Sequence, residues 1–215
     1  MRPTSLAGIL FDLDGTLLDT HDLILASFRH ATRTVLHTII PDDQLMARVG
    51  VPLATQMADF TNDPATHQEL LTVYRAHNAQ FHDTMVKAFD GMAPVIAELQ
   101  SRGLALGVVT SKRREVALQG LRLFGLDTAF AFVLGSDDCA HHKPRPEPIL
   151  QGCAQLGLDP SACAYVGDTP FDLQAAHAAQ VLSVAVTWGM FPEETLRAKH
   201  PDVVCHAPSD LLALV

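Results

Sequence analysis

The segment Leu6–Thr16, which reads LAGILFDLDGT, decides the fold of this chain. It opens with a short apolar run of the kind that forms a buried β-strand, and it ends in two carboxylates and a glycine. Side chains alternate along an extended chain, so we expect Asp12 and Asp14 to point the same way while Leu13 turns toward the core. Gly15 allows a sharp backbone turn directly after them. The segment therefore predicts a strand that carries two acidic side chains to its carboxyl end.

Similar apolar runs return later in the chain and alternate with helical patterns. Short buried strands that alternate with amphipathic helices predict an α/β fold, with a parallel sheet covered on both faces. The predicted strands are Leu6–Leu13, Leu104–Thr110, Ala162–Val166 and Val181–Thr187, and the predicted helices are Met92–Arg102, Glu115–Phe124, Pro148–Leu156 and Phe171–Ala179.

Residues 20–86 interrupt this alternation with three or four consecutive helical stretches. Prolines and acidic residues at Pro41–Asp43 and at Asp63–Pro64 are typical of helix starts. We therefore expect an all-helical insert after the first strand, with the sheet resuming near Phe89–Gly91. The expected division is a core of residues 1–18 and 87–215 and a cap of residues 19–86.

Composition narrows the possible partners. The 215 residues include 15 Lys plus Arg against 24 Asp plus Glu, for a formal net charge of -9. An acidic surface disfavours broad nucleic-acid binding, so an anionic substrate has to be captured locally. The sequence contains no apolar run of about 18 residues and no signal-peptide pattern. We expect a cytoplasmic protein without membrane contact, as a monomer or small homo-oligomer.

The predicted strand ends bring together groups suited to a metal ion and a phosphate. In open parallel sheets, ligands bind outside the carboxyl ends of the strands. Asp12 and Asp168 supply hard oxygen ligands of the kind Mg²⁺ prefers. Lys143 supplies a compact positive charge, and Thr110 followed by Ser111 supplies further phosphate-binding groups. Two carboxylates on one side of a strand can divide the work, one as a nucleophile and the other as a general acid and base.

These residues resemble the four motifs of the haloacid dehalogenase (HAD) superfamily over essentially the whole chain. The motifs are Asp12–Leu17, Thr110–Ser111, Lys143–Pro144, and Gly167–Thr169 with Asp172. The resemblance implies a Rossmann-like core with a helical cap, and an enzyme that forms an aspartyl-phosphate. It implies that Asp12 is the nucleophile and Asp14 the general acid and base. Leu13, Gly15, Thr110, Ser111 and Lys143 would bind the phosphoryl group. Mg²⁺ would bind to Asp12, the backbone carbonyl of Asp14 and Asp168, with Thr169 and Asp172 in support.

Asp14 discriminates among the reactions of the superfamily. Members that act as dehalogenases carry a tyrosine at this position, and phosphonatase members carry a small residue, so both are disfavoured. A β-phosphoglucomutase-like mutase and a catalytically idle phosphate- or partner-binding protein stay open as alternatives. The chain is most similar to the phosphoglycolate phosphatase and HAD-type pyrophosphatase group, which predicts a small phosphorylated substrate.

The cap is expected to select the leaving group. Basic residues that could bind a second anionic group of the substrate, such as the other phosphoryl of pyrophosphate or a carboxylate, are His21, Arg48, Arg75, His77 and His82. Two departures from the pyrophosphatase pattern, at His21 and at Trp188–Met190, leave the choice between pyrophosphate and phosphate esters open.

Overall fold

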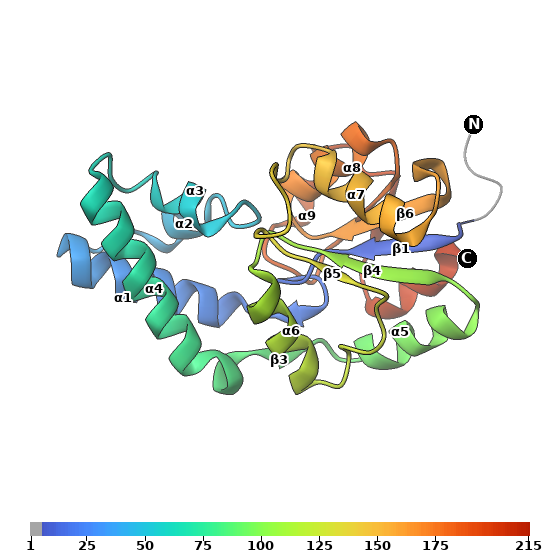
Figure 1. Ribbon diagram of the computed structural model, residues 1–215, viewed down its shortest axis with the longest axis horizontal. Coiled ribbons are helices and arrows are strands. Elements are labelled where there is room, and N and C mark those ends of the chain that lie inside the picture. Colours follow the sequence, from blue (N-terminus) through green and yellow to red (C-terminus); the bar gives the residue numbers. More distant parts are fainter. Residues whose placement is uncertain (1–5) are drawn as a thin grey trace.

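The computed structural model describes residues 6–215 and contains a parallel sheet of six strands (Figure 1). The strand order is β5-β4-β1-β6-β7-β8, so the strand that carries Asp12 lies inside the sheet, between β4 and β6. The strands are β1 (Gly8–Phe11), β4 (Ala105–Val109), β5 (Val133–Leu134), β6 (Cys163–Gly167), β7 (Leu182–Val186) and β8 (Val203–Cys205). The α/β prediction and its four strands are confirmed. Sequence reasoning missed β5 and β8, whose two and three residues are too short for a periodic pattern.

Helices cover both faces of the sheet, and alternate side chains of β1 pack into two different apolar clusters, one on each face. Ile9 and Phe11 belong to a cluster with residues of α5 (Met92–Ser101) and α6 (Arg114–Leu123). Leu10, between them, belongs to a cluster with residues of α7 (Glu147–Leu156) and α8 (Pro170–Ala179). In Figure 1, α7 and α8 lie above the sheet and α5 lies below it. The short helix α9 (Glu193–Arg197) and two 3-10 helices, η1 (Pro160–Ala162) and η2 (Pro208–Leu214), complete this part.

A separate helical region, which we call the cap, lies at the left of Figure 1. It consists of α1 (His21–Leu36), α2 (Asp42–Met46), α3 (Leu53–Met57) and α4 (Pro64–Met85). Its apolar side chains form their own cluster around Phe28, in edge contact with Tyr74 at 4.9 Å between ring centroids. Both predicted helix starts are confirmed. At the start of α4, Asp63 Oδ2 accepts a hydrogen bond of 2.8 Å from the Thr66 N–H.

A two-stranded antiparallel ribbon carries the chain into and out of the cap. Its strands are β2 (Leu18–Asp19) and β3 (Lys87–Ala88). The expectation that the main sheet resumes near Phe89–Gly91 is wrong: this segment leads into α5, and the six-stranded sheet resumes at β4. Gly91 has a φ of +83° at the N-terminus of α5, so the chain turns there and does not extend. We propose the ribbon as the domain boundary, in keeping with the division at residues 18/19 and 86/87.

Within the described residues, none of the helices combines the length and apolar character needed to cross a membrane.

Candidate active site

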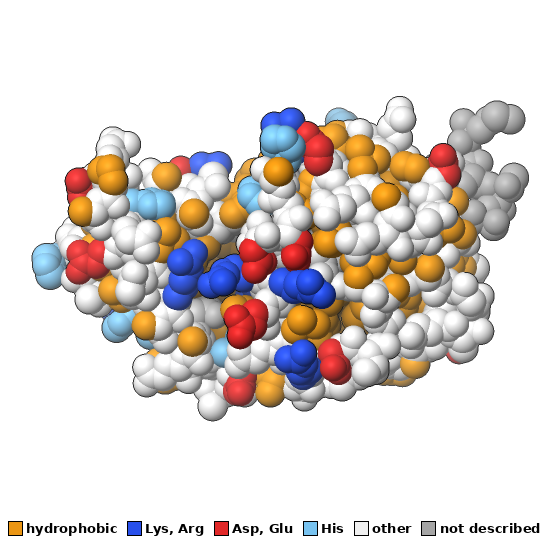
Figure 2. All heavy atoms as spheres, viewed as in Figure 1, with side chains coloured by type: hydrophobic (Ala, Val, Ile, Leu, Met, Phe, Trp, Pro, Cys, Tyr) orange, Lys and Arg blue, Asp and Glu red, His pale blue; other side chains and the backbone are white. Residues whose placement is uncertain are grey.

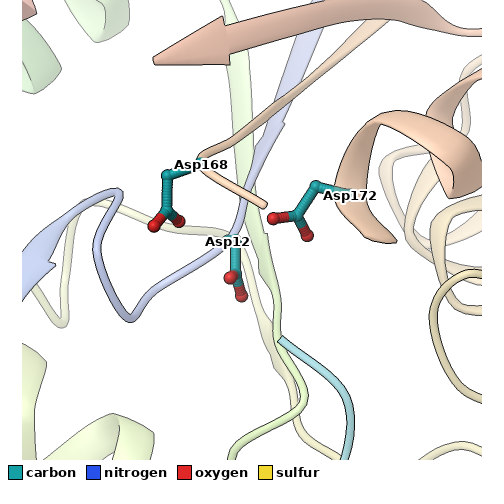
Figure 3. A group of neighbouring side chains, drawn as sticks. All are labelled: Asp12, Asp168 and Asp172. Carbon is teal, nitrogen blue, oxygen red and sulfur yellow. The ribbon is translucent and has the colours of Figure 1, made fainter. Parts of the chain in front are cut away.

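The carboxyl ends of three neighbouring strands meet at one edge of the sheet. Asp12 directly follows β1, Thr110 follows β4, and Asp168 follows β6. Figure 3 shows the carboxylates of Asp12, Asp168 and Asp172 converging, the last from the first turn of α8. All three side chains are buried, with Asp12 only 3% exposed. The residues predicted at the strand ends therefore lie together in one compact cluster.

Lys143 lies at the centre of this cluster. Its Nζ lies 3.0 Å from Asp12 Oδ1, and it donates hydrogen bonds of 2.6 Å to Asp172 Oδ1 and 3.0 Å to Tyr165 Oη. The Tyr165 hydroxyl in turn donates to the Val109 carbonyl at 2.7 Å. Burial opposes the charged form of the lysine, but the Asp12 and Asp172 carboxylates outweigh it and raise the pKa of Lys143. The buried ammonium therefore stays charged beside Asp12.

Asp172 is fully engaged by the protein itself. Its Oδ2 accepts hydrogen bonds from the Thr169 hydroxyl at 2.7 Å and the Thr169 N–H at 3.0 Å, which forms a capping box at the start of α8. Its Oδ1 accepts the bond from Lys143. With both oxygens occupied, Asp172 is suited to position Lys143 and the N-terminus of α8.

Asp168 sits in a tightly fitted recess. Its Oδ1 accepts from the Thr16 hydroxyl and its Oδ2 from the Met190 N–H, both at 2.8 Å. A Cβ at Gly15, which has a φ of +79°, would lie 2.1 Å from Asp168 Oδ2, and a Cβ at Gly189 would lie 2.3 Å from the Asp168 Cβ. Both glycines are therefore required for steric reasons. Burial raises the pKa of Asp168, and the Asp172 and Asp12 carboxylates raise it further.

The acidic residues fit a divalent cation. One carboxylate oxygen each of Asp12, Asp168 and Asp172 lie within 4.8 Å of one another. Asp12 Oδ1 forms an ion pair with Lys143 but has no hydrogen-bond partner. Burial raises the pKa of Asp12 to about 6, and although Lys143 lowers it, Asp172 and Asp14 act in the same direction as burial. Hard oxygen donors and excess negative charge are what Mg²⁺ prefers.

Asp14 has a partner that sequence reasoning did not assign. Both of its carboxylate oxygens accept hydrogen bonds from Lys112 Nζ, at 2.8 and 2.9 Å. Lys112 follows Ser111 directly after β4, and its position after a strand end was the available signal. The Ser111 hydroxyl donates to the Gly50 carbonyl of the cap at 2.6 Å, so it ties the cap to the core. Leu13 is buried in the core, as predicted.

A cavity of about 540 Å³ lies between the cap and the core, next to the site. Asp12, Asp14, Thr110 and Ser111 line it from the core. Lys143 and Asp168 lie beneath this surface, at 3% and 0% exposed. Figure 2 shows basic and acidic side chains gathered where the cap meets the core.

The basic cap residues divide into two groups. Arg75 and His82 line the cavity. Arg48 instead pairs with Asp59 at 2.6 Å, outside the cavity lining. His21 contacts Asp22 and lines a second, smaller pocket. His77 stacks on His30, with 4.7 Å between the ring centroids. Of the five proposed substrate contacts, Arg75 and His82 line the cavity that Asp14 borders, whereas His21, Arg48 and His77 do not.

Comparison with known proteins agrees with this geometry. The family model of haloacid dehalogenase-like hydrolases matches residues 9–186. Pyrophosphatase PpaX of Bacillus pumilus is 34% identical over 215 residues, covering 100% of this chain and 99% of its own. A haloacid dehalogenase-like family hydrolase from Streptococcus pneumoniae superposes with a TM-score of 0.86 at 26% identity, covering 98% of this chain and 99% of its own.

A structure described as a predicted phosphoglycolate phosphatase from Haemophilus somnus superposes with a TM-score of 0.89, covering 98% of each chain. At 24% identity this likeness concerns the fold alone. The matched range contains Asp12, Asp14, Thr110 and Asp168, which follow the strands, and Lys143, which pairs with Asp12. This chain therefore belongs to the haloacid dehalogenase-like hydrolase family.

Proposed function

We propose that this HAD-family phosphatase depends on Mg²⁺ and hydrolyses a small phosphate ester or anhydride through an aspartyl-phosphate on Asp12. The observation that carries the proposal is the buried Asp12 carboxylate, which borders the cavity and lies 3.0 Å from the Lys143 ammonium. The name of the Bacillus pumilus relative favours pyrophosphate. A phosphate ester is the second candidate substrate, because a protein with the same fold is described as a predicted phosphoglycolate phosphatase.

In the first half of the proposed reaction, an Asp12 carboxylate oxygen attacks phosphorus and forms the acyl phosphate. The bond to the leaving oxygen breaks, and Asp14 donates a proton to that oxygen. In the second half, Asp14 takes a proton from water as the water attacks phosphorus, which releases phosphate and restores Asp12. Asp14 lies two residues from Asp12 and borders the same cavity, as this division of work requires.

The charged residues around the two aspartates have distinct proposed roles. Mg²⁺, held by Asp12, Asp168 and the Asp14 carbonyl, would neutralise repulsion between the nucleophile and the phosphoryl oxygens. Lys143 would contribute a fixed positive charge, held in place by Asp172. Lys112 keeps Asp14 at the cavity wall, and a bound phosphoryl group would offer this lysine a second anionic partner. Thr110, with the backbone around Leu13 and Gly15, would orient the phosphoryl oxygens.

The decisive test is phosphate release from 4-nitrophenyl phosphate, with Mg²⁺ or with a chelator, by the wild-type protein and by Asp12→Asn. We expect release that requires Mg²⁺ and Asp12, together with an acid-stable mass increase of one phosphoryl group at Asp12 during turnover. Release by Asp12→Asn would overturn the nucleophile assignment, and undiminished release with the chelator would overturn the metal requirement.

The two alternatives give different results in the same assay. A mutase would interconvert sugar phosphates with little free phosphate, and an idle binder would bind inorganic phosphate without turnover. Either result would overturn the hydrolase proposal. A cytoplasmic location and a monomeric or small oligomeric state stay predictions from the sequence.

A further inference from the structure

We propose that the preferred substrate is an organic phosphate monoester whose alcohol has an apolar body, rather than inorganic pyrophosphate. This inference rests on the proposed function and concerns the leaving group. Its basis is the cavity between cap and core, whose volume of about 540 Å³ lies within the range of about 300–1,000 Å³ typical of sites for organic ligands. Pyrophosphate, two phosphoryl groups joined by one oxygen, would leave much of this space to water.

The walls contributed by the cap are mostly apolar. Ile24 and Phe28 of α1 face the cavity, as do Val49, Val51 and Leu53 in and beside the segment that leads into α3. The core adds Val116 of α6 on the opposite side. Apolar walls stabilise an apolar ligand by removing its surface from water. They offer no hydrogen bond or charge to an anion in place of the hydration that it loses on binding. The cap is therefore suited to an alkyl or aryl group.

The distribution of charge in the cavity leads to the same conclusion. In the described cap residues, Arg75 is the one lysine or arginine that lines the cavity, and its side chain is exposed. On the core side, Lys112 is paired with Asp14, and Arg113 Nε lies 3.9 Å from Asp137 Oδ2. A second phosphoryl group would need several cations to replace its hydration. One free cap cation is too little for a second phosphoryl group, which favours a substrate with one anionic centre, the phosphoryl group that Lys143 and Mg²⁺ would bind over Asp12.

A buried amide in the same wall adds a polar requirement. Gln56 lines the cavity, and its Nε2 donates a hydrogen bond of 2.7 Å to the Val51 carbonyl. Its Oε1 is buried and has no hydrogen-bond partner. Buried polar atoms are normally paired, so this unpaired acceptor of a residue that borders the cavity favours a ligand that brings a donor. The alcohol that we infer therefore carries a hydroxyl or amine in addition to its apolar body.

The test is a chain-length series of methyl, propyl and pentyl phosphate, in which the leaving oxygen changes little while apolar area grows. We expect kcat/KM to rise about fourfold per methylene, equivalent to about 0.8 kcal/mol, and to exceed the value for pyrophosphate at pentyl phosphate. A propyl phosphate with an added terminal hydroxyl should lose its advantage over unsubstituted propyl phosphate in Gln56→Leu.

Leu53→Gln places a polar group in the apolar wall and should lower the ratio of kcat/KM for pentyl over methyl phosphate at least fivefold. Leu150→Gln is the matched control, because Leu150 is 38% exposed on α7 and outside the cavity, and it should leave the ratio unchanged. Binding of methyl and pentyl phosphate to Asp12→Asn, measured by calorimetry, should show the same preference without turnover.

A flat series, or pyrophosphate turned over faster than every ester, would overturn this inference. If that turnover still required Mg²⁺ and Asp12, the proposed function would stand. Loss of all Asp12-dependent release would instead remove the proposed function, while the calorimetric preference would still report on the apolar wall.

Discussion

The core and the cap differ in how directly the sequence places their site residues. In the core, each proposed catalytic or metal-binding residue follows a strand of one parallel sheet or begins the helix after it. In the cap, five basic residues were proposed, but only Arg75 and His82 line the cavity, while Arg48 pairs with Asp59 on the surface.

This difference has a physical cause. Parallel strands in register bring their carboxyl ends to one edge, so residues far apart in sequence meet once the strands are identified. A basic residue on a helix reaches the cavity only if the helix is rotated the right way in the packed cap, which depends on apolar contacts such as that of Phe28 with Tyr74. Core residues should therefore respond strongly to substitution, and cap residues unequally.

The largest effect is expected at Asp14, the proposed general acid and base. Asp14→Asn should lower kcat by about 10²–10⁴-fold, and phosphoenzyme should accumulate because the amide cannot take a proton from water. Rapid-quench mass spectrometry measures both. Asp22→Asn, on the exposed surface of α1, should keep wild-type rates. A near-normal kcat in Asp14→Asn would contradict the role of Asp14 as general acid and base, and with it the expectation that core residues respond most strongly to substitution.

Lys143 should show that the core site is also a structural element. Lys143→Met leaves the Asp12 and Asp172 carboxylates buried without their common partner, which should lower the free energy of unfolding by about 3–5 kcal/mol. Urea unfolding measures this, with exposed Lys87→Met as the control. Adding Asp172→Asn should recover part of the loss, because one unpaired charge is removed. Strict additivity of the two changes would contradict the proposed coupling.

The metal-free protein should lose stability as pH rises. Burial raises the pKa of Asp12 to about 6 from its ordinary 3.8, so its contribution is fully present below 3.8 and is lost as pH rises through about 6. In a chelator, the melting temperature of the wild type should therefore fall by several degrees relative to Asp12→Asn between about pH 5 and about pH 7. Mg²⁺ should remove most of this fall. A pH-independent difference would contradict the raised pKa.

Gly50 tests the contact between the two regions. It has a φ of +110°, and a Cβ there would lie 2.7 Å from the Thr169 hydroxyl. Gly50→Val should hold the cap away from the core and lower kcat/KM about tenfold, as expected for disturbed closure. Gly103→Ala is the control, since its φ of +82° carries similar strain without a neighbour within 4 Å. Equal losses of activity in both variants would indicate that strain alone is responsible.

The smallest effects should separate the cap residues from one another. Arg75→Gln should raise KM for the proposed monoester by about threefold to tenfold, in line with the loss of an exposed charge-assisted contact. Arg48→Gln and His21→Gln should leave KM within about twofold, because neither side chain lines the cavity. Steady-state kinetics of the three variants decide the point, and a larger effect at Arg48 would mean that the cap rearranges when substrate binds.

By itself, the sequence determined the α/β core and the helical insert, because hydrophobic periodicity is a local property that repeats along the chain. It also predicted the meeting of Asp12, Asp14, Thr110 and Asp168, because each lies at or just after the end of a predicted strand and parallel strands end at one edge of their sheet. Only the tertiary structure decided what depends on contacts between distant segments. These features are the hydrogen bonds from Lys112 to Asp14, the fit of Gly189 against Asp168, the short strands β5 and β8, and the apolar cavity under the cap. Such contacts leave no periodic signal, because each arises where two surfaces pack together.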